Sequence, residues 1–142
     1  VRSRGLGDVY KRQTQVVIVD DLVAEDDYMI EVLEMAIPEE IAIGIFNKED
    51  GVTFFSQGLD EPTILLVKGP EVLNYLVDHG INIEEVDVGG MGAGNDRSVL
   101  YKNISTSSEE NDQFRALLGK NVNVFIQVMP NNKPVDISSY LK

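Results

Sequence analysis

Short apolar runs alternate along this chain with segments in which apolar residues recur at helical spacing. The runs predict strands over residues 16–19, 41–46, 63–67, 82–88 and 122–128. The segments between them predict helices over residues 24–36, 70–79 and 107–118, and a poorly patterned helix or turn over residues 48–56. Regular alternation of the two favours an α/β fold, a single-domain, doubly wound and mostly parallel β-sheet with helices on both faces.

Local signals sharpen three of these elements. Ile30, Leu33 and Ile37 share one face of the first helix, where we expect the core, and Pro38 ends that helix. Residues 25–27 supply acidic groups that we expect to lie in solvent at the start of this helix. The last helix opens with the spacing of a capping box, and the strand after it alternates strictly, which predicts a half-exposed strand near an edge.

Charge and composition narrow the class of protein. The chain has 142 residues with 12 basic and 24 acidic side chains, a net charge of −12. Nucleic-acid binding is disfavoured, because it depends on Lys and Arg neutralising phosphates. There is no cysteine and no long apolar run, so disulfides, thiolate metal sites and a predicted membrane span are excluded. No metal or other cofactor is expected.

Residues 1–13 differ from the rest of the chain. They contain four basic groups and one acid, lack apolar periodicity, and resemble translated adapter sequence more than native protein. A signal peptide is not indicated, because it needs an apolar central region. We therefore expect a non-native leader over residues 1–13 and one domain over residues 14–142.

The segment 86–95 is an apolar strand that runs directly into a loop with four glycines. Ligands of open α/β sheets bind at the carboxyl ends of strands, and glycine lets backbone N–H groups approach an anion, so a phosphoryl group is the first candidate ligand. The spacing matches neither a P-loop nor a complete Gly-x-Gly-x-x-Gly motif, since Asn95 stands at the last glycine position. The alternative is a flexible turn that needs positive φ.

Other polar residues have structural explanations. His79, the sole histidine, is predicted in the last turn of a helix, where a cation is favoured by the helix dipole. Asp20 and Asp21 follow the first strand and resemble the start of a receiver domain, so Mg²⁺ binding is one reading and helix capping by Asp21 the other. The hydroxyls of residues 103–108 fit capping and turn formation.

Several stretches together resemble the IIB component of the mannose/fructose/sorbose class of the bacterial sugar phosphotransferase system (PTS). They cover residues 17–24, 63–73, 86–91, 102–105 and 128–136, in that order. The resemblance implies a cytoplasmic protein-Npi-phosphohistidine–sugar phosphotransferase that is peripherally associated with its membrane transporter. Its implied partners are a IIA phosphoryl donor, a IIC/IID sugar channel and the sugar.

The resemblance implies five residues of this chain as candidates for the phosphate loop. They are Gly89, Gly90, Asp21, Lys68 and Gly69. The family's acceptor histidine belongs to a loop of the type Asp-Asp-Arg-Leu-Ile-His-Gly-Gln-Val, which has no counterpart in these 142 residues. No catalytic residue is therefore assigned, and the resemblance implies an N-terminally truncated, inactive IIB component.

The missing segment carries the family's first strand, which is expected well inside the sheet. Its absence leaves two strands without a partner and predicts a marginally stable or aggregating chain, unless residues 5–10 fill the gap. Two alternative functions remain open at this point. One is a regulatory or anion-binding module of the same fold that never carries phosphate, and the other is a receiver-like signalling domain.

Overall fold

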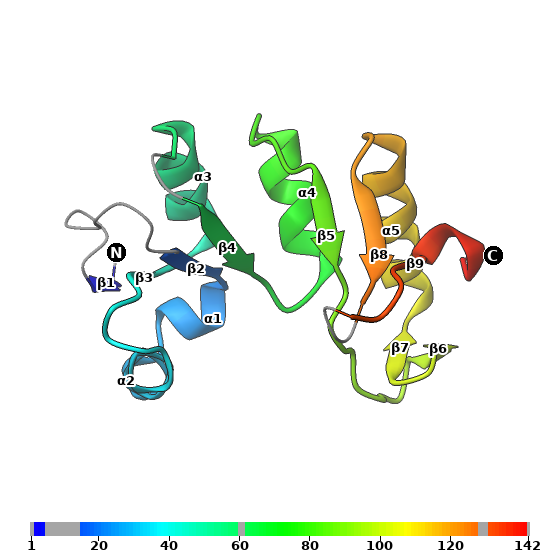
Figure 1. Ribbon diagram of the computed structural model, residues 1–142, viewed down its shortest axis with the longest axis horizontal. Helices are drawn as coiled ribbons and strands as arrows, with labels where there is room; N and C mark the ends of the chain where they lie inside the picture. Colours follow the sequence, from blue (N-terminus) through cyan, green and yellow to red (C-terminus); the bar gives the residue numbers. More distant parts are fainter. Residues whose placement is uncertain (1, 5–14, 60–61, 128–130, 142) are drawn as a thin grey trace. The chain divides into compact units, whose positions relative to one another are not determined.

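A computed structural model describes residues 2–4, 15–59, 62–127 and 131–141 of the chain (Figure 1). The chain divides into two compact units, one formed by residues 1–68 and 75–81 and the other by residues 69–74 and 82–142. Helices and strands alternate in both, which confirms the predicted α/β class. No helix among the described residues combines the length and the apolar character that a bilayer crossing requires.

The first unit contains a four-stranded sheet of order β1-β3-β2-β4. Its strands are β1 (Arg2–Arg4), β2 (Gln15–Val19), β3 (Ile43–Phe46) and β4 (Thr63–Leu66). The pairs β2–β3 and β2–β4 are parallel, as predicted, whereas β1 pairs antiparallel with β3. Part of the segment expected to be a non-native leader therefore extends this sheet, while residues 5–14, including the proposed gap filler, lie outside the described residues.

Helices cover both faces of this sheet. Alternate β2 residues Val16 and Ile18 form a buried cluster with Val23 and Ile30 on one face. On the other face, Val19 lies against α3 (Lys48–Ser56). The packing follows from the strand itself, because a strand buried on both faces needs apolar residues at every position.

The predicted first helix corresponds to α2 (Asp27–Ala36), which begins three residues later than expected, and a short helix that was not predicted, α1 (Asp21–Ala24), precedes it. The break lies at residues 25–26, where the Asp26 carboxylate accepts a hydrogen bond from Met29 N at 3.1 Å and starts α2. The prediction of capping by Asp21 is wrong. Asp20 caps α1, accepting from Leu22 N and Val23 N at 2.9 and 3.0 Å.

The second unit is built on β5 (Glu85–Asp87), β8 (Asn123–Ile126) and β9 (Val135–Asp136), in that spatial order. A separate hairpin joins β6 (Ser98–Tyr101) and β7 (Ile104–Thr106), α5 spans Ser108–Gly119, and a 3-10 turn, η2, spans Ile137–Ser139. β8 alternates in burial as predicted, but it pairs on both sides, with the two-residue β9 as its outer neighbour. Its inward residues are buried, as are Phe114 and Leu117 of α5.

Among the described residues the strands form three sheets where the sequence predicted one. β4 pairs with β2 on one side, β5 pairs with β8 on one side, and no described strand pairs with the other side of either. The helix between them in sequence, α4 (Pro70–Asp78), contributes residues to both units. Among the described strands, β4 and β5 are thus outer strands of their own sheets.

Gly51 allows the close contact between α3 and β2. A Cβ on Gly51 would lie 3.0 Å from Cγ2 of Val19, which is fully buried. Gly51→Ala is expected to lower the free energy of unfolding by about 1–2 kcal/mol, because overpacking outweighs the gain in helix propensity. Gly119→Ala is the matched control, since a Cβ there meets nothing within 4 Å. Urea unfolding in which both variants gain stability would contradict this packing.

Candidate functional site

The glycine-rich segment leaves the carboxyl end of β5. Val88 is buried, and its N–H donates to the Phe125 carbonyl oxygen at 2.9 Å, so the strand direction is held up to the loop. Gly89 and Gly90 are exposed, and a Cβ at Gly89 would meet nothing within 4 Å. None of the loop glycines has positive φ, so the reading of this segment as a turn that needs left-handed backbone is wrong. The fold does not require glycine at position 89.

The hairpin β6–β7 holds the middle of this loop. Met91 is buried and forms an isolated bridge with Ile104, and Ser105 N donates to the Met91 carbonyl oxygen at 2.8 Å. On the same side, a Cβ at Gly90 would lie 3.5 Å from Nδ2 of Asn103. The loop therefore has a fixed course between Val88 and Met91, with the two exposed glycines between buried anchors.

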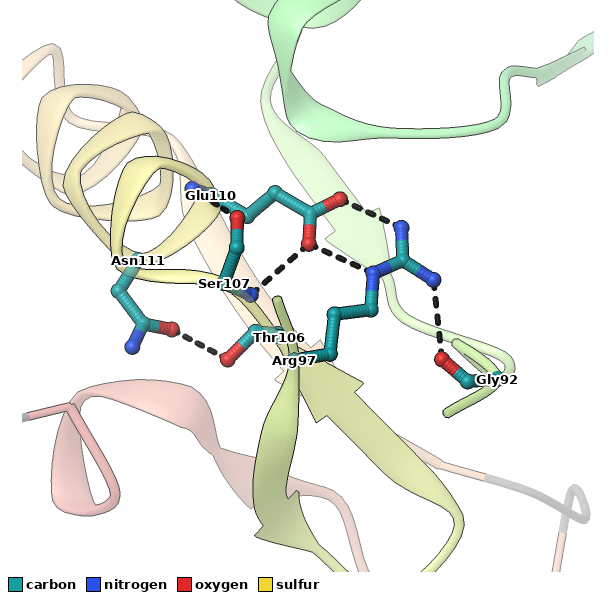
Figure 2. A network of polar contacts seen from close by, with 6 residues as sticks. All are labelled: Gly92, Arg97, Thr106, Ser107, Glu110 and Asn111. Carbon is teal, nitrogen blue, oxygen red and sulfur yellow. Dashed lines mark hydrogen bonds and ion pairs between the residues drawn. The ribbon is translucent and has the colours of Figure 1, made fainter. Parts of the chain in front are cut away.

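Arg97 ties the far end of the loop to the start of α5 (Figure 2). Its Nε and Nη2 donate to Oε1 and Oε2 of Glu110 at 2.9 and 2.7 Å, and its Nη1 donates to the Gly92 carbonyl oxygen at 3.0 Å. Glu110 also accepts from Ser107 N, while Glu110 N donates to Ser107 Oγ, which confirms the predicted capping box. One carboxylate thus joins a helix cap to the glycine loop.

The charges of this network are stable to titration near neutral pH. Burial opposes ionisation of Glu110, but the hydrogen bonds from Arg97 and Ser107 outweigh it and hold the pKa of the carboxyl below its ordinary value. The pKa of Arg97 is raised, chiefly by the hydrogen bond to Glu110. Because a depressed carboxyl pKa stabilises the fold above the unfolded value, this contribution is lost as the pH falls through the folded pKa.

In the first unit, the two aspartates after β2 have different partners. Asp20 is buried, and its Oδ2 lies 3.4 Å from Nζ of Lys68. Asp21 accepts from Lys48 N at 2.8 Å, with Nζ of the same lysine 4.0 Å away. Both carboxylates therefore accept hydrogen bonds from backbone N–H groups of their own unit. No group of acidic or histidine side chains suited to a metal ion occurs in the described part of the chain.

The five phosphate-loop candidates divide between the units. Asp21 and Lys68 belong to the first unit, and Gly69, Gly89 and Gly90 to the second. Lys68 contacts Asp20, which was not among the candidates. Arg97 was missed altogether, because its partner stands 13 positions away and no local pattern indicates the pairing. Glu110 was visible in the sequence, but as a helix cap.

Three further polar residues, Thr106, Ser107 and His79, form contacts within the protein. Thr106 and Ser107 are buried, Ser107 caps α5, and the hydroxyl of Thr106 bonds to Oδ1 of Asn111 (Figure 2). His79 Nδ1 lies 2.7 Å from the Tyr75 carbonyl oxygen, and its ring lies against the Tyr75 ring at 4.1 Å. The structural roles predicted for these residues agree with these contacts.

A hollow of about 330 Å³ lies along β5, β8 and β9, and none of the phosphate-loop candidates lines it. It is lined by Glu85, Asn123, Phe125, Gln127, Pro134 and Asp136. Backbone and side-chain hydrogen bonds from Ser138 lower the pKa of Asp136. Two carboxylates without a lining cation do not favour an anion, so the hollow does not compete with the glycine loop as a phosphate site.

Comparisons with known proteins give one consistent result. The family model described as PTS system sorbose subfamily IIB component matches residues 9–142. The N-acetylgalactosamine-specific phosphotransferase enzyme IIB component 2 of Escherichia coli is 28% identical over 127 residues, 89% of this chain and 81% of the relative. The fructose-specific EIIB component of Bacillus subtilis is 24% identical over 90% of this chain and 80% of its own.

The fold is similar as well. The crystal structure of the IIBSor domain of the sorbose permease from Klebsiella pneumoniae matches with a TM-score of 0.84 at 23% identity. The match covers 89% of this chain and 78% of that structure. The family match begins at residue 9, inside the segment whose composition differs from the rest.

Proposed function

Because the chain belongs to the PTS system sorbose subfamily IIB components, we propose that it is a phosphoryl carrier of a bacterial sugar phosphotransferase system. In this role it takes a phosphoryl group from the phosphohistidine of a IIA partner and passes it to an incoming sugar of the mannose/fructose/sorbose class. The observation that carries the proposal is the family match over residues 9–142.

The glycine loop after β5 supports this role. Gly89 and Gly90 are exposed and carry no side chain that would keep a phosphoryl group from the backbone N–H groups. Arg97 and Glu110 fix the loop, and N–H donors held in place before reaction stabilise phosphoryl charge without reorganisation. In the transfer, a P–N bond to the donor imidazole breaks as a P–N bond to the acceptor imidazole forms.

The resemblance places the family's acceptor histidine in a loop that has no counterpart in these 142 residues, so we propose no acceptor among them. His79 is not proposed as the acceptor, because the resemblance places it outside that loop. Asp21, Lys68 and Gly69 are proposed as further phosphate-loop residues on the resemblance alone. The protein is proposed to work in the cytoplasm, in peripheral association with a IIC/IID channel, and to bind no nucleic acid.

Labelled phosphoenolpyruvate, the general phosphotransferase proteins and a IIA component test the function. The gene product that includes its genomic sequence upstream of Thr14 is expected to gain an acid-labile label on histidine, whereas the 142-residue chain is not. His79→Gln in the longer product should leave labelling unchanged. Label on His79 would refute its exclusion as the acceptor, and an unlabelled longer product would favour a module that never carries phosphate.

A further inference from the structure

Helix α2 presents a second apolar stripe that the described residues of its own unit leave exposed. Tyr28, Val32 and Met35 stand at i, i+4 and i+7, and they are 73%, 40% and 84% exposed. Residues at these spacings lie on one side of a helix. The core side of α2 is a different one, occupied by Ile30 and Leu33, so core packing does not explain the stripe.

The stripe is long enough for a helical partner. It spans two turns of α2, from Tyr28 to Met35. Single exposed apolar side chains are ordinary, but an ordered row along one helix is typical of the anchors by which helices bind one another.

The charge around the stripe is of one sign. Between residues 14 and 47 the sequence contains no Lys, Arg or His. The acidic residues of the same stretch are Asp20, Asp21, Glu25, Asp26, Asp27, Glu31, Glu34, Glu39 and Glu40. Glu31 stands three positions after Tyr28 and four before Met35, so a carboxylate lies beside the stripe.

The exposed apolar stripe and the carboxylates around it together indicate what kind of partner could bind here. Anionic lipid and nucleic acid are disfavoured by the carboxylates, and a second copy facing the same helix would place two acidic surfaces together. A basic amphipathic helix satisfies both features, because its apolar side can cover the stripe while Lys and Arg meet the acidic flanks. Tyr28 offers a ring face to one of those cations.

We propose that the α2 stripe, Tyr28, Val32 and Met35, is a docking surface for a basic amphipathic helix of a partner protein. The surface lies wholly in the first unit and contains none of the phosphate-loop candidates. Its function is therefore independent of phosphoryl transfer, and it can be present whether or not the chain is ever phosphorylated.

The test uses a fluorescent synthetic helix of Leu and Lys with one apolar side, and a scrambled peptide of the same composition as the control for general attraction to an acidic protein. Anisotropy is expected to give at least tenfold tighter binding of the amphipathic peptide. Val32→Gln with Met35→Gln should reduce its affinity to that of the scrambled peptide, since polar replacements keep the helix but remove the anchors.

Val99→Gln is the matched control variant, because Val99 is 73% exposed on β6 in the other unit. It should bind the amphipathic peptide as the wild type does, and far-ultraviolet circular dichroism should show all variants folded alike. Equal binding of both peptides, or equal loss in Val99→Gln, would overturn the proposal. So would sedimentation showing that the stripe holds a dimer that the double variant dissociates.

Discussion

Gly89→Val is expected to reduce phosphoryl transfer through the longer gene product by at least about 100-fold, the cost of losing one backbone donor to a developing phosphoryl charge. In the proposed transfer, a side chain at this position would stand where the phosphoryl group approaches the backbone of the loop. The fold should tolerate valine here, since a Cβ on Gly89 meets nothing within 4 Å and φ is not positive. The free energy of unfolding should therefore change by no more than about 0.5 kcal/mol.

Gly92→Val provides the comparison within the same loop. A Cβ at Gly92 also meets nothing within 4 Å, but this residue lies beyond the buried anchor Met91. Transfer rates measured with a limiting IIA component should stay near the wild-type value in Gly92→Val. Equal rates in both variants would show that the loop does not contact the phosphoryl group.

Glu110→Ala is expected to produce the largest loss of stability among the polar substitutions, about 2–3 kcal/mol. The variant removes the reciprocal bond of the capping box and the carboxylate that receives Arg97. A helix cap contributes roughly 1 kcal/mol, and a hydrogen bond to a charged group roughly 1.5–3 kcal/mol. Because Arg97 also donates to Gly92, release of Arg97 should loosen the glycine loop as well.

Glu110→Gln separates the two contributions, since glutamine keeps the cap and loses the charge. Its stability should lie between those of the wild type and Glu110→Ala, and Glu109→Gln, an exposed change in the same turn, should have little effect. Unfolding as a function of pH adds a second readout. The wild type should lose its advantage over Glu110→Gln as the pH falls below the ordinary range of a glutamate carboxyl and through the lowered pKa of Glu110. An advantage that persists in acid would contradict the ionised pair.

Local patterns predicted several helices because a residue at the start or end of each one marks its boundary in the sequence. α3 has the predicted bounds, α4 begins at Pro70, and Ser107 caps α5. α1 and the later start of α2 were not foreseen, because Asp26 stands in the predicted first turn and reveals its role as a cap only through its backbone conformation. Pairing partners of the strands depend on contacts distant in sequence, which periodicity does not encode.

The candidate site was predictable in part for the same reason. The strand end and its glycines are contiguous in the sequence, and the structure places them as a fixed, exposed loop. Arg97 bonds directly to the loop at Gly92 and is held by Glu110 of another element, so no local spacing could have indicated its role. No local pattern indicated the contacts of Asp20 with Lys68 and of Asp21 with Lys48 either. The residue that caps α1 is Asp20, whereas the sequence suggested Asp21.

The most direct measurement compares backbone amide NMR spectra of the longer gene product before and after phosphorylation by its IIA partner. The phosphoryl site is predicted to lie at the end of β5, so the amide resonances of Gly89 and Gly90 should move most within the described residues. The amides of the hollow formed by β5, β8 and β9 should stay in place. Unchanged Gly89 and Gly90 resonances in a fully phosphorylated sample would contradict the account.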